Sequence, residues 1–235
     1  NILGNFTRLM GSSGWNGTHN ITGHGSTVSG PGYAEMHTGL NSTLTGITDN
    51  TCNKAIPDGN TTFERLKAFN SSIITGAMDG KAVCYLGSPQ LANALAQIDW
   101  WQNRTTYSPT QWPDGTICDD GKDIANKARE FIGNYSNSSF FLTVLFAMPD
   151  CSGHASGDNS VNYNNSFINL NDALGILLDA LANQGINDTT QILITTDHGW
   201  NEGTTVHSTA NADTISNPLI TNNKTGSQKP IEIIF

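Results

Sequence analysis

The sequence has 235 residues, of which 37% are hydrophobic, so it is long enough for one α/β domain with a substantial core. Its formal net charge of −9 argues against nucleic acid and against an anionic membrane surface as partners. No apolar stretch approaches the length that a membrane-spanning helix requires.

Hydrophobic periodicity in the first half of the chain predicts mostly short elements. A proline near the start and Gly39 after the end favour a short helix over Tyr33–Thr38. A short apolar run occupies Ser72–Ala77. Thr61 or Thr62 can cap a helix that runs through Phe69. Apolar spacing predicts a strand over Lys81–Leu86 and a helix over Pro89–Trp101.

The second half of the chain shows a clearer alternation of helices and strands. We expect helices over Asp123–Tyr135 and Phe167–Leu181, and buried strands over Phe140–Phe146 and Gln191–Thr196. A strand, a helix and a strand in this order imply a right-handed crossover in a parallel sheet. The sequence therefore predicts an α/β fold in which helices flank a mostly parallel sheet.

Acidic residues and histidines follow both buried strands of the second half. The first strand runs into MPDCSGH, with Asp150 and His154, and the second runs into TTDHG, with Asp197 and His198. Because sites in parallel sheets form beyond the carboxyl ends of the strands, we expect these side chains to lie together, on neighbouring strands. For Asp197 and His198 taken alone, a helix cap or a surface turn is the alternative.

This combination of carboxylates and imidazoles is typical of a metal site, because divalent ions bind carboxylate oxygen and imidazole nitrogen together. Asp150, His154 and His207 can give one ion three protein ligands and leave one position open. Asp197 and His198 can hold a second ion only with a ligand from elsewhere. Zinc or manganese suits such a set, and calcium is a third candidate. We expect the remaining histidines at the surface, namely His19, His24 and His37.

Ser29 stands directly before Gly30-Pro31-Gly32 at the start of the first predicted helix. A hydroxyl group there faces free backbone N–H groups and the positive end of the helix dipole. This environment favours an alkoxide and binds anionic phosphoryl or sulfuryl groups. The alternative is an ordinary N-cap, because serine is common at that position. Beside a metal centre, however, we expect Ser29 to act as a nucleophile.

Asn-x-Ser/Thr sequences suggest an exported glycoprotein, although the abundance of Asn, Ser and Thr offers a purely compositional explanation. The acceptor asparagines are Asn5, Asn16, Asn20, Asn41, Asn60, Asn70, Asn103, Asn134, Asn137, Asn164, Asn187 and Asn223. An exported protein would pair its four cysteines, whereas buried thiols are the alternative, and the sequence leaves three pairings open among Cys52, Cys84, Cys118 and Cys151. We therefore expect an extracellular or cell-surface protein with N-linked glycans.

Three segments, SGPGYAEMHTG, PDCSGHASG and TTDHGWNEG followed by a histidine, together resemble the alkaline phosphatase superfamily. The resemblance is strongest to its type I phosphodiesterase/nucleotide pyrophosphatase and sulfatase-like branches. NFTRLM is similar to an early helix of that family, and the similarity extends in the expected order over nearly the whole chain. It implies a three-layer α/β/α fold and a single domain over residues 1–235.

The resemblance also implies roles for the candidate residues. Ser29 stands at the position of the family's nucleophile. In this superfamily the nucleophile attacks phosphorus or sulfur in line, while metal ions polarise the ester. Tyr33 replaces the arginine of the formylglycine sulfatase pattern, which argues against an ordinary sulfatase. The candidate ligands match the family's two divalent-ion sites, namely Asp150, His154 and His207 at one and Asp197 and His198 at the other.

The chain departs from the family pattern at both ends. The family begins with a strand that ends in Asp-Gly, whose aspartate completes the second metal site, and nothing before NILGNF supplies it. QKPIEIIF stands where the family continues into a further helix and strand. We therefore expect a domain that lacks its first core strand and its C-terminal end, with another segment or a complementing chain in the open position of the sheet.

The leading hypothesis is an exported, metal-dependent hydrolase of phosphomonoesters or phosphodiesters that acts on a small phosphoester. Trp200, next to the second metal strand, is the candidate for substrate binding. The alternative is a cell-surface or filament-forming glycoprotein that keeps the fold but has degraded or absent catalysis. The missing aspartate and the many acceptor asparagines favour that alternative, and self-assembly is compatible with both hypotheses.

Overall fold

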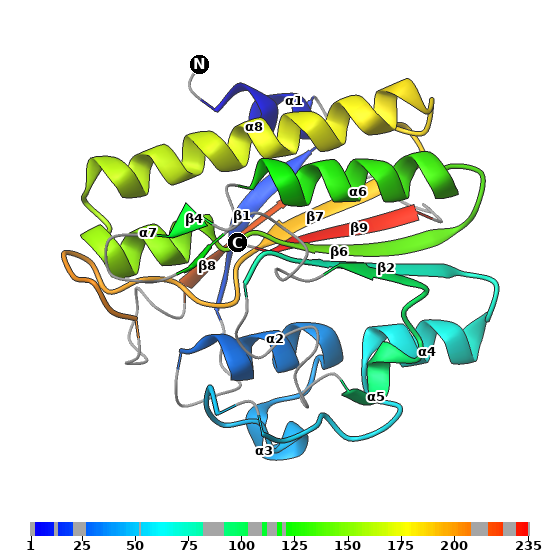
Figure 1. Cartoon of the computed structure of the whole chain (residues 1–235), viewed down its shortest axis with the longest axis horizontal. Helices are drawn as coiled ribbons and strands as arrows, with labels where there is room; N and C mark the ends of the chain where they lie inside the picture. The colour runs from blue at the N-terminus through cyan, green and yellow to red at the C-terminus, as the bar shows by residue number, and fades with distance from the viewer. Residues whose placement is uncertain are drawn as a thin grey trace.

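The computed structural model describes residues 3–11, 14–20, 27–51, 53–81, 92–102, 110–111, 117–118, 121–207, 216–222 and 229–234. In these residues the chain forms three layers, with a sheet between two groups of helices (Figure 1). Most of the paired strands run parallel. The predicted α/β fold, with helices on both faces of a mostly parallel sheet, is therefore confirmed.

The described part of the central sheet has seven strands. From one edge to the other they are β1 (Trp15–Asn20), β8 (Ser216–Thr221), β7 (Thr190–Thr195), β9 (Lys229–Ile234), β6 (Phe140–Leu145), β2 (Ile74–Asp79) and β3 (Trp100–Gln102). The five strands from β7 to β3 are mutually parallel, whereas β8 is antiparallel to both of its neighbours. A separate antiparallel pair consists of β4 (Thr110–Gln111) and β5 (Ile117–Cys118).

β9 lies between β6 and β7, the two strands that lead into the predicted metal ligands. The expectation that the strands before Asp150 and Asp197 are neighbours is therefore wrong. Ile231 and Ile233 of β9 are each 1% exposed, which explains why this apolar segment enters the middle of the sheet. Because all three strands are parallel, the carboxyl ends of β6 and β7 still lie at the same edge.

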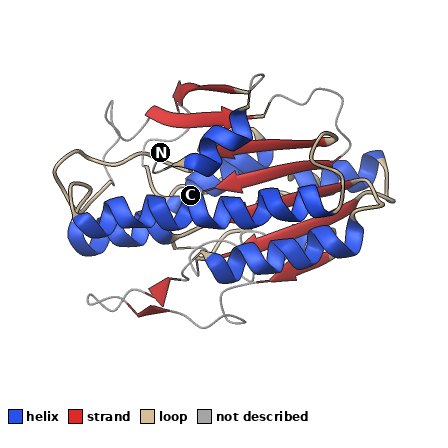
Figure 2. Ribbon diagram, turned by 90° about the horizontal axis from the view of Figure 1, so that it is seen from above, coloured by secondary structure: helices blue, strands red, loops and turns tan. Residues whose placement is uncertain are grey.

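Two long helices, α6 (Lys122–Tyr135) and α8 (Val161–Asn183), run side by side across one face of the sheet (Figure 2). A shorter helix, α1 (Gly4–Met10), packs on α8. The predicted helix over Phe167–Leu181 begins earlier, at Val161, because the Ser160 side chain caps it by accepting a hydrogen bond from Tyr163 N. No helix in the described residues is long and apolar enough to cross a membrane. These helices enclose the larger hydrophobic core, whose fully buried side chains include Phe131, Ile132, Leu142 and Leu177.

Smaller helices cover the opposite face, namely α2 (Ser29–Thr38), α3 (Ser42–Thr45), α4 (Thr62–Phe69) and α5 (Ala92–Leu95). The predicted cap of α4 is confirmed, because the Thr61 side chain accepts a hydrogen bond from Glu64 N. The Glu64 carboxylate accepts one from Thr61 N in return. α2 ends at Gly39 with φ 68°, a left-handed conformation that favours glycine.

The helix predicted over Pro89–Trp101 is wrong in its second half. α5 ends at Leu95, and Trp100 begins β3, which pairs in parallel with β2. The Asp99 carboxylate accepts a 2.7 Å hydrogen bond from Thr75 N, and this contact draws the chain alongside β2. Part of the segment whose apolar spacing predicted a helix therefore forms the edge strand β3.

The run of small and apolar residues at Ser72–Ala77 forms most of β2, and Lys81 lies just beyond the end of that strand. The strand predicted over Lys81–Leu86 stays a prediction, because residues 82–86 lie outside the described part of the chain. The long helices predicted for the second half and both of its buried strands are present in the expected order.

Candidate active site

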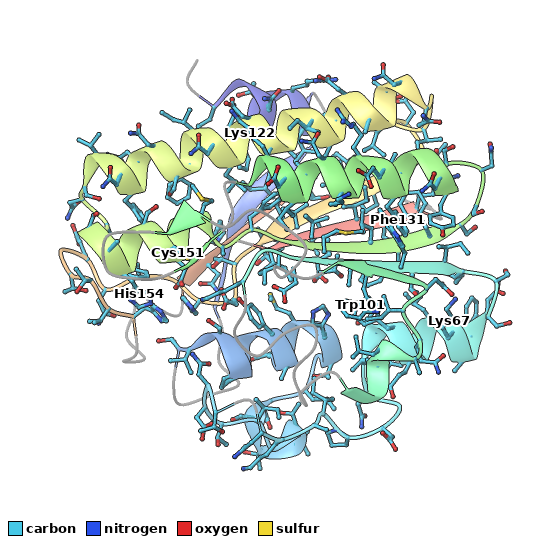
Figure 3. All side chains as sticks on the ribbon, in the orientation of Figure 1. Lys67, Trp101, Lys122, Phe131, Cys151 and His154 are labelled. Carbon is cyan, nitrogen blue, oxygen red and sulfur yellow. The ribbon has the colours of Figure 1, made fainter. Side chains whose placement is uncertain are left out.

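α7 (Met148–Ser156) brings Asp150 and His154 to the carboxyl edge of the sheet. It follows β6 closely, and Pro149 lies in its first turn, where a missing N–H group costs no hydrogen bond. Asp150 lies in the first turn and His154 one turn later, so both side chains share a face of the helix. Figure 3 shows His154 at the end of α7 that faces the loop after β7.

Ser29 is the first helical residue of α2, and it is only 1% exposed. The N-cap is Val28, so the alternative in which Ser29 itself caps the helix does not fit. Gly30 N donates a 2.6 Å hydrogen bond to Asn50 Oδ1, which satisfies one of the free N–H groups at the helix start. Ser29 therefore lies at the positive end of the α2 dipole.

Close packing joins the start of α2 to the end of β7. A Cβ atom on Gly32 would lie 2.7 Å from Asp197 O and 2.9 Å from Asp197 Cβ, so only glycine fits without displacement. Two residues before Ser29, the carbonyl oxygen of Thr27 lies 2.6 Å from His207 Nδ1. These contacts place the Ser29 segment beside two of the predicted metal ligands.

Lys81 links the candidate nucleophile to the candidate metal ligands. Its Nζ donates a 2.7 Å hydrogen bond to Ser29 Oγ and forms a 2.7 Å ion pair with Asp150 Oδ2. The Lys81 and Asp150 side chains are only 13% and 11% exposed. The sequence alone did not indicate a role for Lys81 in the site. The feature that could have indicated one is that Lys81 follows a buried run and Asp79-Gly80, much as Asp197 follows a buried run.

Three histidines share one arrangement of their ring nitrogens. In each ring Nδ1 lies close to a backbone carbonyl oxygen, at 3.0 Å in His154, 3.0 Å in His198 and 2.6 Å in His207. A hydrogen bond from Nδ1–H to each carbonyl leaves Nε2 as the nitrogen with a free lone pair. Histidines that bind metals through Nε2 are held in this way.

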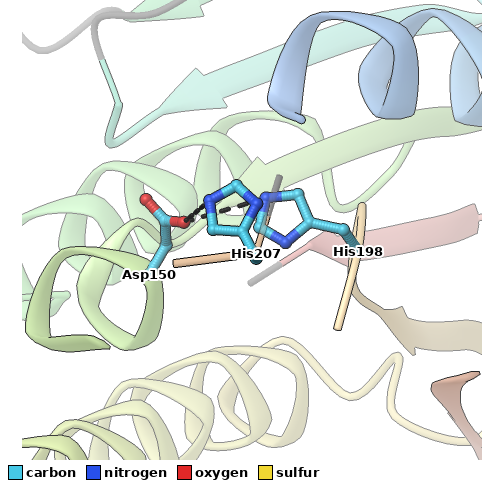
Figure 4. A group of neighbouring side chains, drawn as sticks. All are labelled: Asp150, His198 and His207. Atoms are coloured by element: carbon cyan, nitrogen blue, oxygen red, sulfur yellow. Dashed lines mark ion pairs between the residues drawn. The ribbon is translucent and has the colours of Figure 1, made fainter. Parts of the chain in front are cut away.

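The three Nε2 atoms converge on Asp150 Oδ1, and Figure 4 shows this carboxylate facing His198 and His207. The oxygen lies 3.2 Å from His207 Nε2, 3.6 Å from His154 Nε2 and 3.7 Å from His198 Nε2. The Nε2 atoms of His154 and His207 are 3.0 Å apart, so with Nδ1 protonated their lone pairs repel each other. A cation between them removes this repulsion, and the donor set therefore fits a divalent ion.

Asp197 and His198 adjoin this group beyond the end of β7. Asp197 Oδ2 is 3.4 Å from His198 Nε2, and the two residues are 4% and 5% exposed. Within the described part of the chain neither of these atoms makes a hydrogen bond. Burying such groups without a partner is costly, so both atoms are available as donors to a cation.

The charges of the cluster shift the pKa values of its members. Burial alone would raise the pKa of Asp150, but the Lys81 ammonium group and the nearby histidines hold it well below its usual range. Burial lowers the pKa of His198. Burial also opposes protonation of His207, but the Asp150 carboxylate outweighs it and raises the pKa. Asp150 is therefore ionised and able to bind a cation at neutral pH.

Tyr33 is a second residue that sequence analysis did not assign to the site. It lies one turn after Ser29, is 1% exposed, and its hydroxyl group hydrogen-bonds the Ser29 side chain. Burial and then the charges of Asp197 and Asp150 raise the pKa of Tyr33 well above its ordinary value. Tyr33 therefore stays protonated as a hydrogen-bonding partner of Ser29.

Trp200 borders a cavity of about 140 Å³ beside the cluster. Its ring centroid lies 4.9 Å from that of His154 and 5.0 Å from that of His207. Nε1 donates a 2.9 Å hydrogen bond to Thr204 O, which fixes the ring against the two histidines. Substrate binding by Trp200 stays a prediction. The cavity is also lined by Asp150, His198, Tyr163, Phe167 and Pro218.

The structure brings the predicted catalytic and metal-binding residues to one edge of the sheet, namely Ser29, Asp150, His154, Asp197, His198 and His207. His37, expected at the surface, is instead fully buried, with its ring centroid 5.3 Å from that of Phe63. That expectation is wrong because the face of α2 that carries His37 packs against the smaller core, which includes Phe63. The side chains of His19 and His24 lie outside the described residues.

The acceptor asparagines differ in their surroundings. Asn60 is partly buried, and its amide nitrogen donates to two backbone carbonyls. Asn5 Nδ2 donates a 2.8 Å hydrogen bond to Asn171 O, and a Cβ on Gly175 would lie 2.6 Å from it, so the packing of α1 on α8 argues against a glycan there. The exposed ones are Asn41, Asn70, Asn134, Asn137, Asn164 and Asn187. The side chains outside the described residues are those of Asn16, Asn20, Asn103 and Asn223, together with Cys52, Cys84 and Cys118.

Several solved structures share this fold. Yidj from Bacteroides fragilis, described as a sulfatase, is 16% identical with a TM-score of 0.62, over 99% of this chain and 66% of that one. A protein in the alkaline phosphatase superfamily from Vibrio parahaemolyticus is 18% identical with a TM-score of 0.58, over 97% and 56%. TAB5 alkaline phosphatase, in a mutant with bound Mg, is 14% identical with a TM-score of 0.57, over 98% and 86%.

The TM-scores show a common fold, and the chain spans about six tenths of the length of several matched structures. No curated protein matches the sequence. Residues 1–226, however, match the sequence profile of type I phosphodiesterase / nucleotide pyrophosphatase. The chain therefore belongs to the type I phosphodiesterase / nucleotide pyrophosphatase family.

Proposed function

We propose that the protein is an exported, metal-dependent hydrolase of phosphate esters that uses Ser29 as its nucleophile. The observation that carries this proposal is the contact chain from Ser29 Oγ through Lys81 Nζ to Asp150 Oδ2, with 2.7 Å at each step. These contacts bring together the Ser29 hydroxyl group, the Lys81 ammonium group and the carboxylate of Asp150, a candidate metal ligand. Positive charge fixed at that point suits the anionic oxygens of a phosphoryl group.

The donor atoms of the site define what a metal would add. Asp150, His154 and His207 would hold a divalent ion, which would supply positive charge to polarise the ester and stabilise its developing negative charge. Imidazole and carboxylate donors together suit zinc, with manganese as the next candidate. Asp197 and His198 extend the same donor set on the side of α2.

Ser29 carries the covalent step. A bond forms between Ser29 Oγ and phosphorus as the bond from phosphorus to the leaving oxygen breaks, and the serine proton balances the proton that the leaving alcohol gains. Water then displaces Oγ from phosphorus, which restores the hydroxyl group and releases the phosphate product. The N-terminus of α2 and the Lys81 ammonium group stabilise the anionic oxygens during both steps.

The organic part of the substrate would extend toward Trp200 and the neighbouring cavity. This cavity adjoins Asp150 and His198, so a leaving group there would be close to the cluster. Its aromatic lining, which includes Tyr163 and Phe167, favours an apolar or aromatic group. A small phosphoester with such a group is the proposed substrate.

Export is proposed on separate grounds. The chain has four cysteines, an even number that an exported protein would pair in an oxidising compartment. Six of the acceptor asparagines are exposed, so N-linked glycans can be accommodated without disturbing the core. Both features support the proposed extracellular or cell-surface location.

The test is hydrolysis of chromogenic esters by the purified, metal-loaded protein. We expect turnover of 4-nitrophenyl phosphate or bis(4-nitrophenyl) phosphate that falls by roughly 10⁴-fold or more in Ser29→Ala. Ser71→Ala, at an exposed position after α4, is the matched control and should keep the wild-type rate. Faster turnover of 4-nitrophenyl sulfate than of either phosphate would move the proposal to sulfate esters.

The rival function is that of an architectural glycoprotein at the cell surface. It predicts no turnover of any of these esters by the metal-loaded protein, or a slow background rate that Ser29→Ala leaves unchanged. Either result would refute the hydrolase.

A further inference from the structure

Lys81 occupies the space next to the candidate nucleophile. Its ammonium group contacts Ser29 Oγ and Asp150 Oδ2 at 2.7 Å each, and its side chain is 13% exposed. Three elements meet at this group, because α2 provides Ser29, β2 leads into Lys81, and α7 provides Asp150. The ammonium group is therefore enclosed by the site.

The end of β2 fixes the backbone from which Lys81 extends. Asp79, which is 1% exposed, accepts a 2.8 Å hydrogen bond from Lys81 N at Oδ1. Gly80 N donates a 3.0 Å hydrogen bond to Leu145 O of β6. Both residues before Lys81 are thus anchored to the sheet, and a catalytic group held by a rigid element is well positioned.

The spacing of the donor atoms fits one ion. The three Nε2 atoms of His154, His198 and His207 lie 3.2–3.7 Å from Asp150 Oδ1. Donor atoms around a tetrahedral Zn²⁺, with bonds of about 2.1 Å, lie roughly 3.4 Å from one another. The distances to Asp150 Oδ1 are therefore compatible with a single ion, and the donor atoms of Asp150, His198 and His207 all lie within 4.8 Å of one another.

A second ion beside Ser29 would compete with Lys81. The carboxylates that act on the Lys81 charge are Asp79 at the end of β2, Asp150 on α7 and Asp197 after β7. Asp150 already has a positive partner in the ammonium group, which also contacts the nucleophile directly. A divalent cation close to Nζ would also be repelled by it.

We propose that Lys81 is a catalytic residue that takes the place of one of the two cations expected from the family resemblance, so that the site works with a single divalent ion. Lys81 orients Ser29 Oγ and donates a hydrogen bond to an anionic phosphoryl oxygen in the transition state. It remains an ammonium group throughout and transfers no proton. The catalytic role rests on the proposed function, whereas the ion count does not.

The first test removes the charge of Lys81. In Lys81→Met we expect kcat on the preferred phosphate ester to fall by about 10²–10³-fold, as on loss of one donor to a transition-state oxyanion. Lys81→Arg should retain more activity than Lys81→Met, because it keeps the charge. Lys127→Met, on the exposed side of α6, is the matched control and should keep the wild-type kcat. Thermal unfolding shows whether Lys81→Met is folded. A folded Lys81→Met protein that keeps the wild-type kcat would overturn the proposal.

The second test counts ions and does not depend on turnover. Native mass spectrometry of wild-type protein, loaded with excess Zn²⁺ and then freed of unbound metal, should show one ion per chain. In Lys81→Met the site loses this positive charge and should admit a second ion. Two ions in the wild-type chain, with Ser29-dependent turnover, would refute this inference alone. One ion without turnover of any ester would refute the proposed function and the catalytic role of Lys81 together.

Discussion

The parallel strands of the central sheet end at one edge and begin at the opposite edge, and these two edges differ in chemistry (Figure 1). Where the strands end, the chain places buried polar and charged groups, among them Lys81, Asp150 and Asp197. Where β2, β6 and β7 begin, the segments before them carry exposed acceptor asparagines, namely Asn70, Asn137 and Asn187.

This difference follows from the connectivity of a parallel α/β sheet. Every parallel strand delivers its following residues to one edge, where side chains from distant parts of the sequence converge. The helices α4, α6 and α8 end at the opposite edge, where short surface loops lead into β2, β6 and β7. Topology therefore separates the proposed chemistry from these three proposed glycan sites. Changes at the two edges should have very different effects.

After Ser29→Ala, the largest effect at the catalytic edge is expected from Asp150→Asn. One carboxylate contacts both Lys81 and the histidine cluster, so we expect kcat/KM to fall by about 10³-fold or more. The free energy of unfolding should fall by about 3 kcal/mol, because Lys81 is left as a buried charge without its partner. Kinetics and urea unfolding measure the two effects. Asp172→Asn, which disrupts an exposed pair 3.6 Å long, should change neither quantity appreciably.

A smaller effect is expected from Gly32→Ala, which removes no candidate reacting group. Its new Cβ would lie 2.7 Å from Asp197 O, so α2 must move away from β7. We expect a loss of about 1–3 kcal/mol in stability and a fall in kcat of about 10–100-fold as Ser29 shifts. Gly133→Ala on α6 is the control, because its Cβ meets nothing within 4 Å. That control should be neutral or slightly stabilising, and a Gly32→Ala protein with the same behaviour would show that the α2 contact is unimportant.

His37 lies in the smaller core and should affect stability alone. Burial lowers its pKa from 6.5 to about 4 in the folded chain, so between these pH values the unfolded state binds more protons. Stability is therefore full above pH 6.5 and falls as the pH drops toward 4, by up to about 3 kcal/mol from this residue. Unfolding by urea at several pH values should show a weaker acid dependence in His37→Phe. An unchanged pH dependence in that variant would exclude His37 as the cause.

The smallest effect is expected at the opposite edge. Replacing Asn70, Asn137 and Asn187 by glutamine should leave kcat unchanged and stability within about 0.5 kcal/mol, because all three are exposed. In protein secreted from a eukaryotic host, intact-mass measurement should show the loss of one glycan for each replaced site. A clear loss of activity in the unglycosylated variant would contradict the claim that this edge of the sheet takes no part in catalysis.

The sequence predicted the fold and the candidate site where local patterns and topology agree. Buried runs such as Phe140–Phe146 have one reasonable structure, and the carboxyl ends of parallel strands then bring Asp150 and Asp197 together. The insertion of β9 between their strands could not be predicted, because KPIEII is short and strand order depends on long-range pairing.

Lys81 and His37 show a second limit of the sequence. A lysine after a buried strand is ordinarily solvated, and only the fold reveals that Ser29 and Asp150 approach it from two other elements. His37 has polar and apolar neighbours in sequence, so its burial depends on Phe63 of another helix. In both cases the decisive partner lies more than twenty residues away in the chain.

The most direct test is a crystal structure of the zinc-loaded protein with vanadate, which mimics the phosphoryl group in transfer. We predict a zinc ion at about 2.0–2.2 Å from Asp150 and the histidine Nε2 atoms, a bond from vanadium to Ser29 Oγ, and Lys81 Nζ within hydrogen-bonding distance of a vanadate oxygen. Vanadate bound elsewhere, or zinc bound while Ser29 Oγ points away from it, would contradict the proposed site.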